Sequence, residues 1–144
     1  MAFKNILLPV FIGCVISLPA SASTQITCLA LNVYHEARGE SRDGKQAVAA
    51  VTMNRVRSKQ FPSSVCSVVW QRKQFSWTHI KKSYVPDDTK AWKTALSIAQ
   101  NTISGEINVR YKNILYFHNK ASSPYWSKSK RLITSVGNHL FYSK

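Results

Sequence analysis

Apolar side chains recur at helical spacing in three stretches of the chain, and this pattern predicts three helices. They are expected over residues 24–38, 43–57 and 86–104. Thr24 and Asp43 precede the first two apolar stretches, so each is predicted to be the N-cap of its helix. The chain therefore begins with helical structure.

The last third of the chain has the pattern of strands. Residues 113–119 read as one strand, and residues 132–136 and 139–143 read as a hairpin around a two-residue Gly-Asn turn. Apolar and polar side chains alternate over residues 74–80, which predicts a further strand or hairpin arm there. Helices first and a short antiparallel sheet toward the C-terminus predict a small α+β domain.

Residues 1–22 have the pattern of a secretory signal peptide and are predicted to lie outside this domain. Lys4 precedes the apolar stretch 6–18, and Ala20 to Ala22 has the small residues of a cleavage site. The apolar stretch is short for a membrane span. Cleavage after Ala22 leaves 23–144 as one domain, exported to the periplasm, cell wall or extracellular space. The alternative is an uncleaved signal that keeps the chain in contact with the membrane.

The net charge of the exported domain indicates its binding partners. The chain has 20 Lys and Arg and 6 Asp and Glu, and removal of Lys4 leaves 19 basic and 6 acidic residues, a formal charge of +13. An exported protein does not normally meet nucleic acid, so anionic cell-envelope polymers or lipid headgroups are the expected partners of a monomer. The alternative interpretation is that the charge only keeps a small domain soluble.

Cysteine usage agrees with export. Cys14 lies in the predicted signal, which leaves Cys28 and Cys66 as an even pair in an oxidising compartment. A disulfide between them is expected, and two separate buried thiols are the alternative.

Glu36 is the acidic residue best placed for chemistry. Three of the six acids begin predicted helices, where capping explains them. Glu36 instead follows Leu29 and Val33 on the apolar face of the first helix, so partial burial should favour its neutral form, which can donate a proton. An ion-paired helix residue is the alternative. Glu40, just past Gly39, is expected to be more exposed.

Four motifs occur in order: VYHEARGESRDGKQAVAAVTMNRVRSKQFPSSVCSVVW, QFSW, LYFHN and VGNHLFY. Together, from about Cys28 to Tyr142, they resemble the cell-wall hydrolase family typified by the spore-cortex lytic enzyme SleB. The resemblance implies a lysozyme-like α+β catalytic domain that cleaves peptidoglycan glycan strands as a lytic transglycosylase. It also implies that Glu36, the first acid of the Glu-Ala-Arg-Gly-Glu motif, is catalytic, with Glu40 as support.

The same resemblance suggests the residues that bind substrate. Phe75 and Trp77 are expected on a cleft wall, and packing in the core is the alternative. Tyr116, His118 and Asn119 are expected to line the groove opposite Glu36 and to bind N-acetyl and hydroxyl groups. For His118, a structural hydrogen bond is the alternative.

Asn54 and the aromatic pair in the basic loop 122–130 also have predicted roles, and two positions depart from the family. Asn54 is predicted to be a buried supporting residue that needs hydrogen-bond partners. Tyr125 and Trp126 could contact glycan or membrane, or pack locally. Relatives of similar length often carry extra cysteines where Lys73 and His79 stand, so a second disulfide is absent here.

Other functions remain open at this point. A hydrolytic muramidase would use the same acid, and an N-acetylmuramoyl-L-alanine amidase would need zinc. The four histidines lack the paired spacing of a zinc site, so neither a metal nor a cofactor is expected. A cationic wall- or membrane-binding protein is the non-enzymatic alternative. A bacterial enzyme and a phage endolysin both fit, and the small size favours the endolysin slightly.

Overall fold

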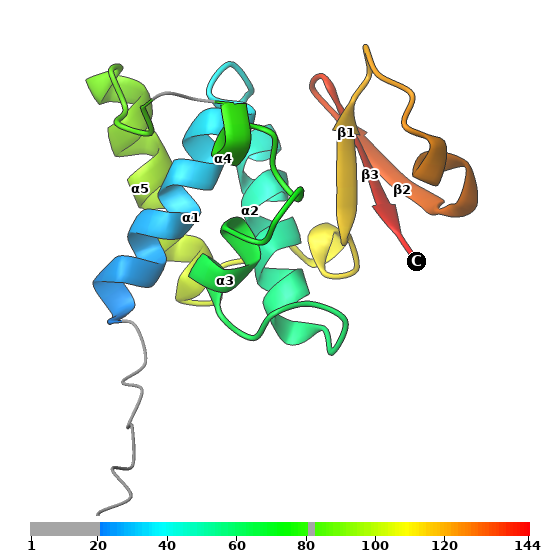
Figure 1. Ribbon diagram of the computed structural model, residues 1–144, viewed down its shortest axis with the longest axis horizontal. Helices are drawn as coiled ribbons and strands as arrows, with labels where there is room; N and C mark the ends of the chain where they lie inside the picture. Colours follow the sequence, from blue (N-terminus) through cyan, green and yellow to red (C-terminus); the bar gives the residue numbers. More distant parts are fainter. Residues whose placement is uncertain (1–20, 81–82) are drawn as a thin grey trace, which may run out of the picture.

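The computed structural model describes residues 21–80 and 83–144, in which the helices precede the sheet. The α-helices gather on one side of the molecule and the three strands on the other (Figure 1). In chain order the helical elements are α1 (Ala22–Ala37), α2 (Arg42–Arg57), α3 (Val65–Val69), α4 (Trp77–Ile80), α5 (Thr89–Ile103) and the 3-10 helices η1 (Val109–Tyr111) and η2 (Tyr125–Ser129). This order confirms the predicted α+β architecture.

The predicted signal peptide falls almost entirely outside the described residues. Only Ser21 and Ala22 of it are described, and Ala22 is already the first residue of α1. Within the described ranges, no helix is both long and apolar enough to span a bilayer.

Serine residues cap the first two helices. The Ser21 side chain accepts a hydrogen bond from the Thr24 amide, and the Ser41 side chain accepts one from the Gly44 amide. The predicted caps Thr24 and Asp43 are therefore wrong, because a serine upstream of each provides the first acceptor. The third predicted helix, α5, is confirmed, but it begins at Thr89, three residues later than predicted, with Asp88 as its N-cap.

Asp88 and Asp43 both lie near the start of a helix, but their side chains have different partners. Asp88 caps α5 by accepting from the Ala91 amide at 2.9 Å. Asp43 instead accepts a hydrogen bond from the Tyr111 hydroxyl at 2.7 Å and pairs with Arg110. Asp43 thus ties α2 to η1 across a long sequence separation.

The sheet is antiparallel and small. Its strands are β1 (Tyr116–Asn119), β2 (Arg131–Val136) and β3 (His139–Ser143), in the order β1-β3-β2. The predicted hairpin is confirmed, and its two-residue turn places Gly137 at φ +55°. The predicted strand 113–119 is shorter than expected and begins at Tyr116.

The predicted strand over residues 74–80 is wrong. This segment ends in the short helix α4, where the Thr78 hydroxyl donates to the Phe75 carbonyl oxygen at 2.7 Å. The described strands pair only with one another, so this segment has no neighbouring strand edge. Local hydrogen bonds satisfy its backbone instead.

Helix α2 is central because it packs on both sides. One core, with Leu29, Val33 and Ile98 fully buried, lies among α1, α2 and α5. The other, with Val48 and Phe141, joins α2 to the sheet. Each large buried side chain contributes about 1.5–3 kcal/mol to stability. The sheet is therefore held against α2 by apolar packing.

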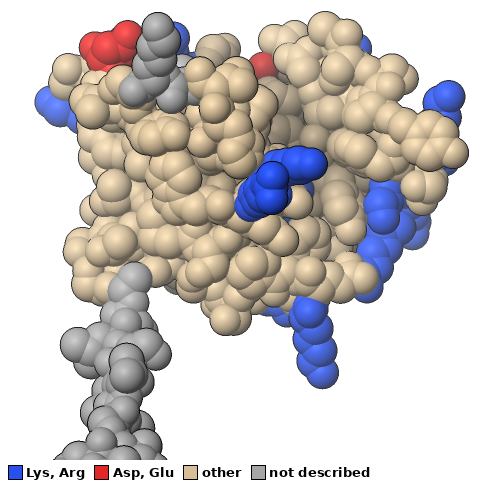
Figure 2. All heavy atoms as spheres, in the orientation of Figure 1, with Lys and Arg blue, Asp and Glu red and all other residues tan. Residues whose placement is uncertain are grey.

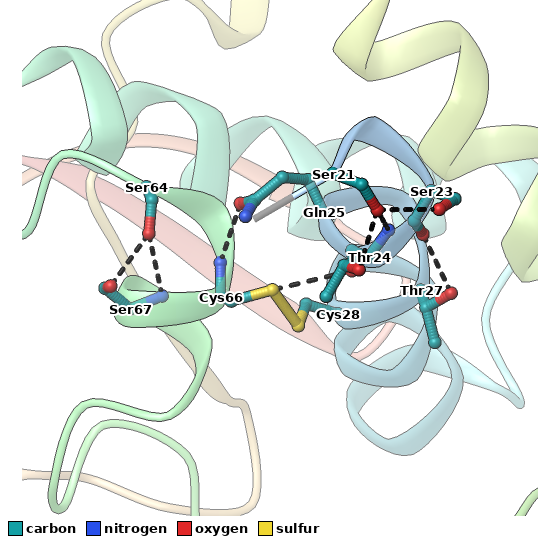
Figure 3. The surroundings of a disulfide bond; sticks show 9 residues. All are labelled: Ser21, Ser23, Thr24, Gln25, Thr27, Cys28, Ser64, Cys66 and Ser67. Carbon is teal, nitrogen blue, oxygen red and sulfur yellow. Dashed lines mark hydrogen bonds between the residues drawn. A yellow bond between two sulfur atoms is a disulfide. The ribbon is translucent and has the colours of Figure 1, made fainter. Parts of the chain in front are cut away.

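A disulfide joins α1 to α3. Cys28 and Cys66 are bonded, with their Cα atoms 5.2 Å apart, which confirms the expected pairing. Figure 3 shows that Gln25 reinforces it, since the Cys66 amide donates to its side-chain oxygen at 3.1 Å. Closing this loop stabilises the fold by about 4 kcal/mol in the chain-entropy model.

Candidate active site

A groove between the helices and the sheet contains Glu36. Its pocket of about 360 Å³ is bounded by α1, α2, the loop before α4, and strands β1 and β3. Figure 2 shows the molecular surface hollowed between the helices and the sheet. Among the described residues that line the pocket, Glu36 is the only Asp or Glu. It is therefore the carboxyl group that a bound molecule would meet.

Burial sets the protonation of Glu36. It lies near the end of α1, one and two turns beyond the fully buried Val33 and Leu29. Loss of solvent raises its pKa from the usual 4.5 to about 7, and the positive charge of Arg55 opposes this rise. The side chain can thus hold a proton near neutral pH and still release it, which a general acid requires.

Arg55 from α2 also lines the pocket, although no motif or spacing in the sequence marks it as functional. Its Nε donates to the Leu115 carbonyl oxygen at 2.8 Å, and its guanidinium lies 5.0 Å from the Phe61 ring and 5.3 Å from the Phe75 ring. Burial lowers its pKa to about 10, so it remains charged. Its buried Nη1 has no hydrogen-bond partner among the described residues.

Glu40 is buried, which corrects the expectation that it is exposed. Its side chain is 8% exposed, and its Oε2 accepts from the Asn138 amide at 3.2 Å. Its Oε1 lies 3.6 Å from Nδ1 of His139. Glu40 therefore fastens the corner between α1 and α2 to the β2–β3 turn, and it does not line the pocket that holds Glu36.

His139 is a second pocket residue that the sequence did not indicate as functional. It lies at the start of β3, and its ring is 5.3 Å from that of Phe117. Burial lowers its pKa, and the Glu40 carboxylate opposes this change. The neutral imidazole therefore predominates at neutral pH and can accept or donate one hydrogen bond in the pocket.

Most of the predicted substrate-binding residues lie along the groove. Phe75, His118 and Asn119 line the Glu36 pocket, and Tyr116 lines the pocket next to it. The structural role considered for His118 is also present, since its Nε2 lies 2.9 Å from the Tyr142 hydroxyl. These residues come from the loop before α4 and from β1.

Trp77 is not in the groove. It is 2% exposed, its indole N–H donates to Asn32 Oδ1 at 3.0 Å, and its ring centroid lies 4.6 Å from that of His35. The structure thus places Trp77 in the helical core, the alternative that its sequence position left open.

Asn54 does not line the Glu36 pocket but supports the segment next to it. Its side-chain amide donates to the carbonyl oxygens of Tyr111 at 2.7 Å and Ile114 at 2.8 Å, which fixes the segment leading into β1. It also borders a larger pocket of about 720 Å³ away from Glu36. No Asp or Glu side chain is among the described residues lining that pocket, so the smaller one is the better candidate for acid catalysis.

Lys73 and His79, the two positions at which the family resemblance suggests cysteines, are in contact. The Lys73 amide donates to Nε2 of His79 at 2.8 Å. Separately, the described segments bring together no group of three or more His, Cys, Asp or Glu side chains that could hold a metal ion.

Comparison with known proteins connects this geometry to one family. The family model described as Cell Wall Hydrolase matches residues 39–142, a region that begins three residues after Glu36. The spore cortex-lytic enzyme of Bacillus subtilis (strain 168) is 29% identical over 120 residues, which are 83% of this chain and 38% of the relative. That of Oceanobacillus iheyensis is 31% identical, over 83% of this chain and 42% of the relative. The chain thus spans about two fifths of the length of these relatives.

Solved structures give a closer match in length. The catalytic domain of the germination-specific lytic transglycosylase SleB from Bacillus anthracis aligns with a TM-score of 0.70 and 30% identity, covering 88% of this chain and all of that domain. The catalytic domain of the Bacillus cereus SleB protein aligns with a TM-score of 0.68 and 28% identity, covering 91% and 99%. The chain therefore belongs to the Cell Wall Hydrolase family and has the fold of the SleB catalytic domain.

Proposed function

We propose that this chain is an exported lytic transglycosylase that cleaves the bond between N-acetylmuramic acid and N-acetylglucosamine in peptidoglycan. The observation that carries the proposal is Glu36, a half-buried carboxyl with a pKa of about 7 in a groove whose described lining holds no other acid. The similar domain from Bacillus anthracis is described as a lytic transglycosylase, which supports the same chemistry here.

A single carboxyl group is sufficient for this reaction. Glu36 donates its proton to the bridging oxygen, the glycosidic bond breaks, and positive charge develops at C1 of the muramic acid. The C6 hydroxyl of that sugar attacks C1 and gives its proton to the Glu36 carboxylate. The product is a 1,6-anhydro sugar, no water is consumed, and Glu36 returns to its protonated form.

Arg55 supports the charged stage of this cycle. While Glu36 is ionised, the Arg55 guanidinium in the same pocket wall stabilises the carboxylate without neutralising it by proton transfer. Since Leu115 and the rings of Phe61 and Phe75 hold Arg55 in place, little rearrangement is needed between the two stages.

The setting we propose follows the charge and the N-terminal pattern. The chain is exported, acts as a monomer in the periplasm, cell wall or extracellular space, and is attracted to anionic envelope polymers by its basic surface. A phage endolysin using the host's export pathway is one form of this proposal.

Replacement of Glu36 tests the proposal. We expect Glu36→Gln to lower the rate of glycan cleavage by a factor on the order of 100 to 10,000, because the amide cannot donate a proton to the leaving oxygen. Glu106→Gln makes the same change at an exposed acid and should keep the parental rate. A folded Glu36→Gln variant that cleaves sacculi as fast as the parent would refute the proposal.

Mass spectrometry of the digested peptidoglycan identifies the bond broken. Anhydro-muramic ends support the transglycosylase reaction, and reducing muramic ends indicate a hydrolytic muramidase. Free stem peptides indicate an amidase, and no new ends indicate a cationic binding protein.

A further inference from the structure

A second pocket continues the groove beyond Glu36. It has a volume of about 430 Å³ and shares Arg55, Lys73 and His118 with the Glu36 pocket. Tyr116, Trp126 and Lys130 belong to the second pocket alone, and Glu36 does not line it. We call this second space the Trp126 pocket. A glycan strand bound at Glu36 would have room to extend into the Trp126 pocket.

Aromatic rings form one wall of the Trp126 pocket. The Trp126 ring centroid lies 5.8 Å from that of Tyr116 and 5.5 Å from that of His118. Both Trp126 and Tyr116 are half-buried, so each keeps part of its ring accessible. Rings held in this way can stack against the apolar face of a sugar.

Three cationic side chains surround the same space. Arg55, Lys73 and Lys130 line the Trp126 pocket, and no Asp or Glu is among its described lining residues. The Lys130 ammonium lies over the Tyr116 ring, 4.5 Å from its centroid. The ion pairs found among the described side chains involve none of these three cations. The pocket thus presents unbalanced positive charge.

Lys73 adds independent evidence of a site. Its φ of +64° makes it the only described residue other than glycine with positive φ. This conformation is unfavourable for a residue with a Cβ atom, by about 1 kcal/mol. The hydrogen bond from its amide to His79 helps to hold it there. The strained backbone places a lysine at both pockets of the groove.

We propose that the Trp126 pocket binds a peptidoglycan unit whose stem peptide carries free carboxylates. Tyr116 and Trp126 contact the sugar, and Lys73 and Lys130 pair with the carboxylates. A neutral glycan alone would give the cations no partner. This assignment rests on the proposed glycan cleavage and adds that the enzyme distinguishes strands by the charge of their peptides.

Chemical amidation of the stem-peptide carboxylates tests this assignment on the unaltered protein. Soluble uncrosslinked strands, free of teichoic acid, are compared before and after their carboxylates are coupled to ammonia. We expect the parental enzyme to show a KM about tenfold higher on amidated strands, since two partly exposed ion pairs are lost, with a smaller change in kcat. An unchanged KM overturns the proposal.

A double variant locates the effect in the Trp126 pocket. Lys73→Met with Lys130→Met should raise KM about tenfold on untreated strands and cause no further loss on amidated ones. Lys59→Met with Lys93→Met removes the same charge from exposed positions outside both pockets and is the matched control. The assignment is overturned if the double variant raises KM equally on untreated and amidated strands. It is also overturned if the rise in KM is no larger than that of the control variant.

The two proposals fail in different ways. If Glu36→Gln remains active, the glycan-cleavage mechanism is refuted. If Glu36→Gln is inactive while amidation and the lysine substitutions leave KM unchanged, only the role of the Trp126 pocket is refuted.

Discussion

Glu36 makes the folded chain less stable at neutral pH than an uncharged residue would. Its folded pKa of about 7 lies above the usual 4.5, so the folded state keeps a proton that the unfolded state releases. The proton bound to Glu36 therefore adds to the free energy of unfolding. This contribution is fully present below pH 4.5 and is lost as the pH rises through 7. The shift corresponds to about 3 kcal/mol, as an upper value for a half-buried group.

Glu36→Gln should therefore be more stable than the parent at pH 8, by up to about 3 kcal/mol, and by little at pH 4. Urea unfolding of both proteins at pH 4, 6 and 8 measures the difference, and Glu106→Gln should show no such trend. A difference that is constant with pH would contradict the burial of a titrating Glu36.

The site residues that could be predicted from the sequence are those whose surroundings are set by neighbours within a few residues. Glu36 follows apolar positions on its own helix, so its partial burial could be predicted from helical spacing alone. Arg55 and His139 could not be predicted in this way. Arg55 obtains its partner Leu115 sixty residues later, and His139 obtains Glu40 from the opposite end of the domain.

At the level of elements, the β2–β3 turn tests how tightly Glu40 is packed. A Cβ atom at Gly137 would overlap Glu40 Oε2, and the φ of +55° at Gly137 already disfavours a side chain. We expect Gly137→Ala to destabilise the fold by about 2 kcal/mol, from backbone strain together with loss of the hydrogen bond that Glu40 accepts. Urea unfolding measures this loss.

Two other glycines are the controls for this substitution. Gly105→Ala has open space but a φ of +100°, so only backbone strain of about 1 kcal/mol is expected. Gly39→Ala has open space without positive φ and should change stability by less than about 0.5 kcal/mol. Equal effects at all three sites would mean that Glu40 does not occupy the space against the turn.

Whole elements were predictable where their signals are local. Helix α5 and the β2–β3 hairpin carry strong periodicity and a clear cap or turn, and both were predicted. The segment 74–80 was mistaken for a strand, because alternation over seven residues does not reveal whether a partner strand exists. Thr24 and Asp43 were mistaken for caps because several nearby residues could serve.

For the whole molecule, the large excess of Lys and Arg over Asp and Glu predicts binding that depends on salt. The Glu36→Gln variant, which should not degrade its substrate, can be sedimented with purified sacculi at 50 and 300 mM salt. We expect clearly weaker binding at the higher concentration. Binding that salt does not change would mean that the basic surface is not used for attraction.

The groove itself is a property of the whole chain. Its lining comes from α1, α2, the loop before α4, and two strands, which only the packing of the sheet on α2 brings together. The motifs allowed most of its residues to be predicted as a group, but not their arrangement. Trp77, only two residues after Phe75, lies in the core instead.

The contact between Lys73 and His79 has a consequence for where the protein can work. A hydrogen bond from the Lys73 amide to the His79 ring, and no disulfide, holds this side of the groove entrance, so thiol reductants should leave the contact intact. The groove entrance should therefore keep this contact in reducing and in oxidising surroundings alike.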